Sequence, residues 1–182
     1  MRLLERLTIV VVSLAIAIGV IVVLSGGPLS GRDSPGVSGS TTQLGVGFRD
    51  LGNAHLAPGS PRPRYDSNPP TSGPHVPAAV RRDASTLSDN QLLEALALGD
   101  VVVMYGANNP PLRLRRLVAS VAAPFTPALA SAGQAVILAH RRGLSGLLAL
   151  AWTRLLHVRT AGDRQLRSFM LFWLGRGAAS HN

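Results

Sequence analysis

The stretch Ser88–Tyr105, SDNQLLEALALGDVVVMY, decides the fold class, because it joins a complete helix signal to a complete strand signal. Its opening Ser-x-x-Gln has the form of a capping box, and Gly99 follows the leucines as a C-terminal cap. These signals predict a helix over residues 89–98. The run Val101–Tyr105 consists of three valines, a methionine and a tyrosine and stops at turn residues, which predicts a buried strand.

Further helical and strand patterns follow this unit along the chain. The apolar spacing from Leu114 to Val121 predicts a second helix, stopped by Pro124, and Thr160 is expected to cap a last helix over residues 163–174. Three further strands are expected at residues 134–139, 147–152 and, more weakly patterned, 155–158. This order predicts a small α+β domain of three or four strands packed with about three helices.

The composition excludes several kinds of chemistry. The 182 residues include no cysteine, so a disulfide framework, thiolate catalysis and cysteine-based metal sites are ruled out. All 18 basic residues are arginine, which removes lysine-dependent mechanisms. The net charge of +9 invites a nucleic-acid partner, but the arginines are not interleaved with aromatic platforms and no nucleic-acid motif occurs. We expect no nucleic-acid binding, and anionic lipid headgroups suit this charge better.

The N-terminus predicts a membrane anchor. Residues 7–24 carry neither charge nor proline, and with the next three residues they are long enough to cross a bilayer. Arg2 and Arg6 precede this run, which indicates a cytoplasmic N-terminus (residues 1–6) and an extracytoplasmic C-terminal part. A cleavable signal peptide is the alternative, but the run is long and ends in a poor cleavage site.

The expected organisation is therefore that of a single-pass protein of the cell membrane. A transmembrane anchor at residues 7–27 leads into a flexible Gly/Ser/Pro-rich linker at 28–44. The extracytoplasmic domain is expected over residues 45–178, and residues 179–182 form a tail. The uncharged stretch 117–139 contains two prolines and is assigned to the domain rather than to a second span.

A proline-rich segment, residues 58–77, precedes the first helix. Seven prolines in 20 residues forbid helix and central strand, so the chain is expected to run extended and to be ordered by packing on the domain. Its polar residues suit tight turns. The segment carries one motif: Tyr65, Asn68, Pro69, Pro70, Thr71, Ser72, Gly73, Pro74 and His75.

This motif, preceded by Asp50-Leu51-Gly52-x-x-His55, resembles the signature of a bacterial family catalogued as domain of unknown function 3105. Members are similar in layout, with an N-terminal anchor, a helix–strand unit, an Ala-Trp strand and a C-terminal helix ending in Gly-Arg-Gly. The resemblance covers about residues 45–178. It implies a fold and a location in the envelope, and no reaction.

The chain departs from the family pattern in the helix before the valine strand. The family typically reads Leu-Val-His-Ser-Leu-Glu-His-Gly there, and this chain has Glu94, Ala97 and Leu98 in place of the first histidine, the glutamate and the second histidine. A function that depends on those histidines does not carry over to this chain.

His55 and His75 are the candidate metal ligands. Both lie in turn-rich chain, and converging imidazoles would bind zinc or copper if Asp50, Asp66 or Glu94 added a carboxylate. The competing interpretation is that both histidines hydrogen-bond to the backbone and hold the proline-rich segment. Ser72 with His75 as nucleophile and base, or two of the carboxylates as a glycosidase pair, has weaker support.

Two functions follow from these observations. The missing helix histidines favour a non-enzymatic binding or interaction module of the cell envelope, with no catalytic residues and no required cofactor, whose partner is an envelope protein or anionic lipid. The alternative is a metal-binding or enzymatic envelope domain that uses His55 and His75.

Overall fold

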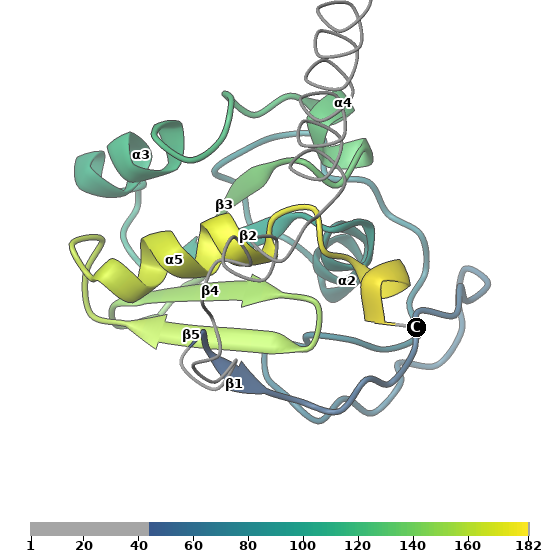
Figure 1. The fold of residues 1–182 in the computed structure, drawn as a ribbon. Helices are drawn as coiled ribbons and strands as arrows, with labels where there is room; N and C mark the ends of the chain where they lie inside the picture. The colour runs from purple at the N-terminus through teal and green to yellow at the C-terminus, as the bar shows by residue number, and fades with distance from the viewer. Residues whose placement is uncertain (1–43, 182) are drawn as a thin grey trace, which may run out of the picture. The chain divides into compact units, whose positions relative to one another are not determined.

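The computed structural model describes residues 44–181, and its sheet is built around β2 (Val101–Tyr105), whose five residues are all buried. β2 pairs in parallel with β3 (Val136–His140) and antiparallel with β4 (Leu147–Ala151). β4 pairs antiparallel with β5 (Arg154–Val158), which pairs with the two-residue β1 (Val46–Gly47). The strand order is β1-β5-β4-β2-β3 (Figure 1).

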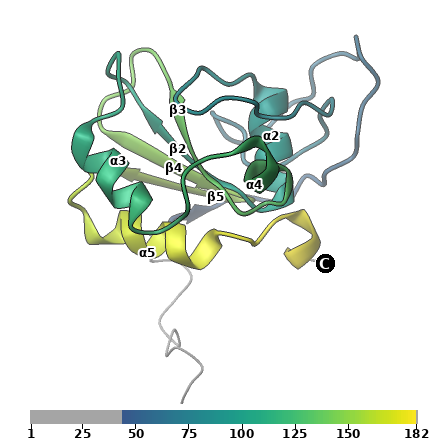
Figure 2. The same cartoon turned by 90° about the horizontal axis from the view of Figure 1, so that it is seen from above.

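Both faces of the sheet are covered, because successive residues of a strand point to opposite faces. On β2, Val102 and Met104 belong to a core shared with α2 (Asp89–Leu98) and α4 (Pro127–Ser131). The alternate residues of β2 belong to a second core, shared with α3 (Leu112–Ala119) and α5 (Arg164–Trp173). Figure 2 shows α2 and α5 on opposite sides of the strands.

The helix α2 forms as the sequence predicts. The Ser88 side chain accepts from the Gln91 N–H, while the Gln91 side chain accepts from the Ser88 N–H, so the capping box is complete. Gly99 ends the helix in the left-handed conformation, at φ 117°. Leucines 92, 93 and 96 are buried, which leaves the neighbouring Glu94 on the side of the helix that meets the preceding chain.

The α+β class is confirmed, but the structure contains more strands and helices than the sequence analysis predicts. Residues 44–181 contain five strands and four α-helices instead of three or four strands and about three helices. The strand β1 has only two residues. The helix α4 begins at Pro127, and proline usually indicates the end of a helix in sequence. Thr126 caps α4 through its side chain, and proline is well tolerated in the first turn.

Several predicted boundaries need correction. The strand expected at 134–139 begins at Val136, because Ala135 N–H donates to Asp100 instead of a neighbouring strand. The strand expected at 147–152 ends at Ala151, where the chain turns through Thr153 at φ 59°. The helix expected to follow a Thr160 cap is capped by Asp163, whose side chain accepts from Gln165 N–H.

The proline-rich segment contains no helix and no strand longer than an isolated bridge, as predicted. We call residues 54–77, which include it, the strap. The expected tail begins within a 3₁₀-helix, η2 (Ala178–His181), which contacts α2. The predicted cytoplasmic segment 1–6, anchor 7–27 and all but the last residue of the linker 28–44 lie outside the described residues. Among residues 44–181, no helix is both long and apolar enough to cross a membrane.

Candidate metal site

A backbone bridge brings the two candidate histidines together. Leu56 N–H donates to His75 O at 2.8 Å, and His75 N–H donates to Ala54 O at 3.1 Å. The strap therefore folds back on itself, and residues 20 positions apart in sequence become neighbours. The two imidazole rings lie edge to face with their centroids 5.6 Å apart.

Glu94 of α2 completes a group of three side chains. Its Oε2 lies 3.3 Å from His75 Nε2 and 3.9 Å from His55 Nε2. One potential ligand atom from each of the three residues lies within 4.8 Å of the other two. The His75 side chain is fully buried, the Glu94 side chain is 17% exposed and the His55 side chain is 60% exposed. The group is therefore buried on one side and open to solvent on the other.

The two ring nitrogens of His75 have different surroundings. Nδ1 lies 2.9 Å from Gly73 O, and because a carbonyl only accepts, Nδ1 carries a proton and donates it to this carbonyl. In the neutral form of the ring, Nε2 is an acceptor that faces the acceptor oxygens of the Glu94 carboxylate. Within residues 44–181, neither His75 Nε2 nor Glu94 Oε2 has a hydrogen-bond partner. Two acceptors this close repel each other unless a proton, a metal ion or a bridging water lies between them.

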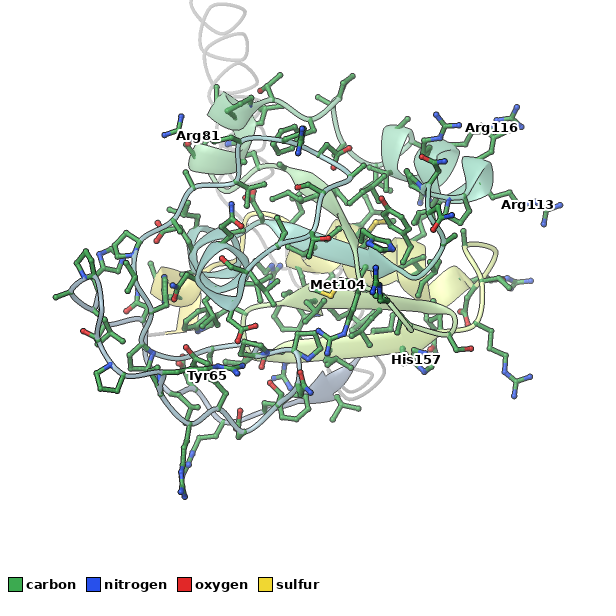
Figure 3. All side chains as sticks on the ribbon, turned by 180° about the vertical axis from the view of Figure 1, so that it is seen from behind. Tyr65, Arg81, Met104, Arg113, Arg116 and His157 are labelled. Carbon is green, nitrogen blue, oxygen red and sulfur yellow. The ribbon has the colours of Figure 1, made fainter. Side chains whose placement is uncertain are left out.

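Tyr65 and Gly73 of the motif pack against each other inside the strap. The Tyr65 hydroxyl donates to Pro74 O at 3.0 Å. Tyr65 is labelled in Figure 3. Gly73 lies directly against the Tyr65 ring at φ 132°, so that a Cβ there would approach the ring atoms to 2.9 Å. This packing holds the turn whose carbonyl orients His75.

Other motif residues tie the strap to the sheet. Thr71 O accepts from Thr153 N–H, which connects the strap to the turn between β4 and β5. Asn68 Oδ1 accepts from the Arg141 side chain, which follows β3. The motif prolines beside these contacts are buried, namely Pro69 and Pro70.

The other carboxylates proposed as ligands are engaged elsewhere. Asp50 accepts from Trp152 Nε1 at 2.9 Å and from Gly52 N–H at 2.8 Å. Asp66 accepts from Arg49 N–H at 3.1 Å. Neither belongs to the group of His55, His75 and Glu94. The three carboxylates thus have separate structural settings, and only Glu94 meets the histidines.

A serine nucleophile at Ser72 does not fit the geometry. Ser72 is fully buried, and its hydroxyl donates to Arg49 O at 3.0 Å while accepting from Leu51 N–H. His75 uses Nδ1 on Gly73 and directs Nε2 to Glu94, so the two side chains do not form a nucleophile–base pair. Ser72 instead anchors the strap to the chain at residues 49–51.

Sequence reasoning did not single out Asp100, which is 1% exposed at the end of α2. Burial raises its pKa from 3.8 to about 7, against the opposing effect of the hydrogen bond that Ala135 N–H donates to Oδ1 at 2.8 Å. Its Oδ2 has no hydrogen-bond partner in the part of the chain that the structure describes. Asp100 and Glu94 line the same small cavity next to α2. The position directly after a helix-capping glycine was the only sequence signal, and it does not indicate burial.

The comparisons agree with the resemblance seen in the sequence. The model of a family described as "Protein of unknown function (DUF3105)" matches residues 60–179, which is well over half of the 182-residue chain. His75 and Glu94 lie inside the matched range, and His55 lies just before it. No curated protein and no solved structure matches the chain. The chain belongs to the DUF3105 family of proteins of unknown function.

Proposed function

We propose that this chain is a membrane-anchored extracytoplasmic domain that binds a divalent transition-metal ion, zinc or copper(II), through His55, His75 and Glu94. The convergence of these three side chains is the observation that carries the proposal. It favours the metal-binding alternative over an interaction module without a metal. Membrane anchoring rests on the apolar run at residues 7–27 and its flanking arginines.

The donor set suits these ions. Two imidazoles and one carboxylate are the protein ligands of many catalytic zinc sites, which keep a fourth position for water or substrate. Imidazole also suits copper(II), whereas the absence of cysteine makes the site a poor one for copper(I). The exposed side of the group, at His55, is where such an exchangeable position would face solvent.

The distances fit a nearly formed site. Nitrogen and oxygen ligands held about 2 Å from one tetrahedral ion lie about 3.3 Å from each other. The His75–Glu94 pair already has this separation, at 3.3 Å. The His55–Glu94 separation of 3.9 Å needs a shift of about half an ångström, which is small for an exposed side chain. Binding would therefore require almost no rearrangement of the buried half.

The contact behind His75 supports the same role. Histidine ligands commonly donate their second ring N–H to a backbone carbonyl, which fixes the tautomer and aims the free nitrogen at the metal. His75 makes this contact through Nδ1 to Gly73 O. Position 94 is also where the family pattern has a histidine, so one metal-binding residue type replaces another there.

The competing account is an ion pair between a protonated His75 and Glu94, with no metal. Calorimetric titration of the full chain with zinc and with copper(II) at neutral pH separates the two accounts. The proposal predicts one ion per chain with submicromolar affinity. His55→Ala and Glu94→Gln should each weaken binding by at least roughly tenfold. His55 is exposed and Glu94→Gln keeps the side-chain shape, so neither variant depends on repacking the core.

The matched control is His157→Ala, which removes another exposed histidine on β5 whose ring contacts Ser145 O. Its affinity should equal that of the wild type. Binding that survives both site variants, or that falls equally in the control, would refute the site. An absence of stoichiometric binding in the folded wild-type chain would leave the ion pair as the correct account.

A further inference from the structure

A cleft of about 540 Å³ opens at the end of the sheet where β2 finishes. Its walls come from the residues after β2, the first turn of α3, the β3–β4 loop and the β5–α5 loop. None of the residues that line the cleft belongs to the group of His55, His75 and Glu94, so the two sites have no residue in common.

The interior of the cleft is mainly apolar. Its lining includes Leu112, Leu144, Leu147 and Ala161. Leu112 is 52% exposed, one of the few large apolar side chains on the described surface. The volume lies in the range of pockets that hold one small molecule. An apolar hollow of this size suits the hydrocarbon part of a ligand rather than a folded partner.

The charge at the rim has a single sign. Arg113 and Arg159 line the cleft, and none of the lining residues is acidic. The first turn of α3 also lacks acidic residues. Within residues 44–181, neither guanidinium has an ion-pair or hydrogen-bond partner. Arg113 extends from α3 into solvent (Figure 3), so its long side chain is free to fold over a bound anion.

Two features restrict the conformations that the walls of the cleft can adopt. Gly106 passes so close to the β3–β4 loop that a Cβ there would lie 2.0 Å from Leu144 O. Pro110 and Pro111 restrict the chain that leads into α3. A preformed hollow loses less conformational entropy on binding than one that must be assembled.

From these features we infer that the cleft binds a single-chain anionic amphiphile of the fatty-acid class. The hydrocarbon chain lies against the leucines, and the carboxylate lies at the rim between Arg113 and Arg159. This site is independent of the proposed metal site.

A photoreactive dodecanoic acid that carries a diazirine on its chain tests this inference. The full chain is reconstituted in phosphatidylcholine nanodiscs, irradiated with the probe, and digested for adduct mapping by mass spectrometry. The adducts should concentrate in residues 105–113, 144–147 and 159–161, which form the cleft. The corresponding diazirine dodecanol, which lacks the charge, should label these residues roughly tenfold less.

Variants then separate the rim charges from the net charge. Arg113→Glu and Arg159→Glu, each tested singly, should lower cleft labelling by roughly fivefold, and Ala161→Trp should lower it by filling the hollow. Arg116→Glu changes a neighbouring arginine of α3 that does not line the cleft and should leave labelling within about twofold of the wild type. The side chains of the substituted arginines have no hydrogen-bond or ion-pair partners within residues 44–181, and unchanged melting temperatures will show that these variants are folded.

Three results would overturn the inference. Adducts spread over the surface in proportion to exposure would show that the cleft holds no preferred ligand. Equal labelling by the acid and the alcohol would show that the arginines do not select an anion. An equal loss in Arg116→Glu would make net charge, not the cleft, responsible.

Discussion

Replacing Asp100 by asparagine should stabilise the domain at neutral and alkaline pH and remove much of its pH dependence. Asp100 is almost fully buried, and burial raises its pKa from 3.8 to about 7. Its Oδ1 accepts from Ala135 N–H, and an asparagine oxygen can accept the same bond. The uncharged amide NH₂ of asparagine takes the place of the OH of the protonated carboxyl group. The Asp100→Asn variant would thus imitate the neutral form of the carboxyl group at every pH.

The direction of the effect follows from proton binding. Between about pH 4 and pH 7 the folded state holds a proton on Asp100 that the unfolded state has released, so the free energy of unfolding falls as the pH rises. The stability that the proton on Asp100 contributes is fully present below the pKa of the unfolded state, and it is lost as the pH rises above the pKa of the folded state. A difference of about three pKa units corresponds to roughly 4 kcal/mol. Roughly 3 kcal/mol of this is lost between pH 5 and pH 8.

Urea unfolding of residues 45–182 at pH 5 and at pH 8 measures this difference. The Asp100→Asn variant should lose roughly 3 kcal/mol less than the wild type between the two pH values. Asp100→Ala is the matched control, because it also lacks the titrating group but leaves Ala135 N–H without its partner. Asp100→Ala should show the same reduced pH dependence as Asp100→Asn, but its free energy of unfolding should be lower than that of Asp100→Asn by about 1–3 kcal/mol. Parallel curves for the wild type and Asp100→Asn would refute the raised pKa.

Three further predictions concern the strap and the anchor. Tyr65→Ala should destabilise residues 45–182 by about 3 kcal/mol. Tyr65→Phe should cost only about 1 kcal/mol, because it removes just the hydrogen bond to Pro74. An unchanged melting temperature in the alanine variant would show that packing of Tyr65 does not stabilise the domain. Gly73→Ala should lower the melting temperature of the same fragment, because of the positive φ and the contact with the Tyr65 ring; a melting curve identical to that of the wild type would contradict this packing. A reporter that is active only outside the cytoplasm, fused after Asn182, should give signal, and the full chain should stay in the membrane fraction through a high-salt wash; release of a shortened chain would indicate a cleaved signal peptide.

The parts of the fold with local signals were predictable from the sequence. The capping box at Ser88 and the glycine at 99 mark both ends of α2, and its predicted bounds of 89–98 match the structure. The strand β2 contains three valines and lies between two turns, and its bounds also match the prediction. By contrast, β1 consists of Val46 and Gly47 and exists because they pair with β5, a contact that no local pattern indicates.

The candidate site could be predicted only in part. Its two histidines were visible because they lie in motifs, but three carboxylates were equally good partners in the sequence. The choice of Glu94 depends on how the strap lies against α2, which is a matter of tertiary packing. The cleft at Arg113 and Arg159 was not visible for the same reason, since four separate segments form its walls.

The most direct test of the central claim is an anomalous difference map from crystals of the protein grown with zinc, recorded on both sides of the zinc absorption edge. The account predicts one strong peak about 2 Å from His75 Nε2, His55 Nε2 and a Glu94 carboxylate oxygen. The His75 Nδ1 contact with Gly73 O should be retained. A map with no peak between these residues, or with zinc bound only at other histidines, would contradict the proposed metal site.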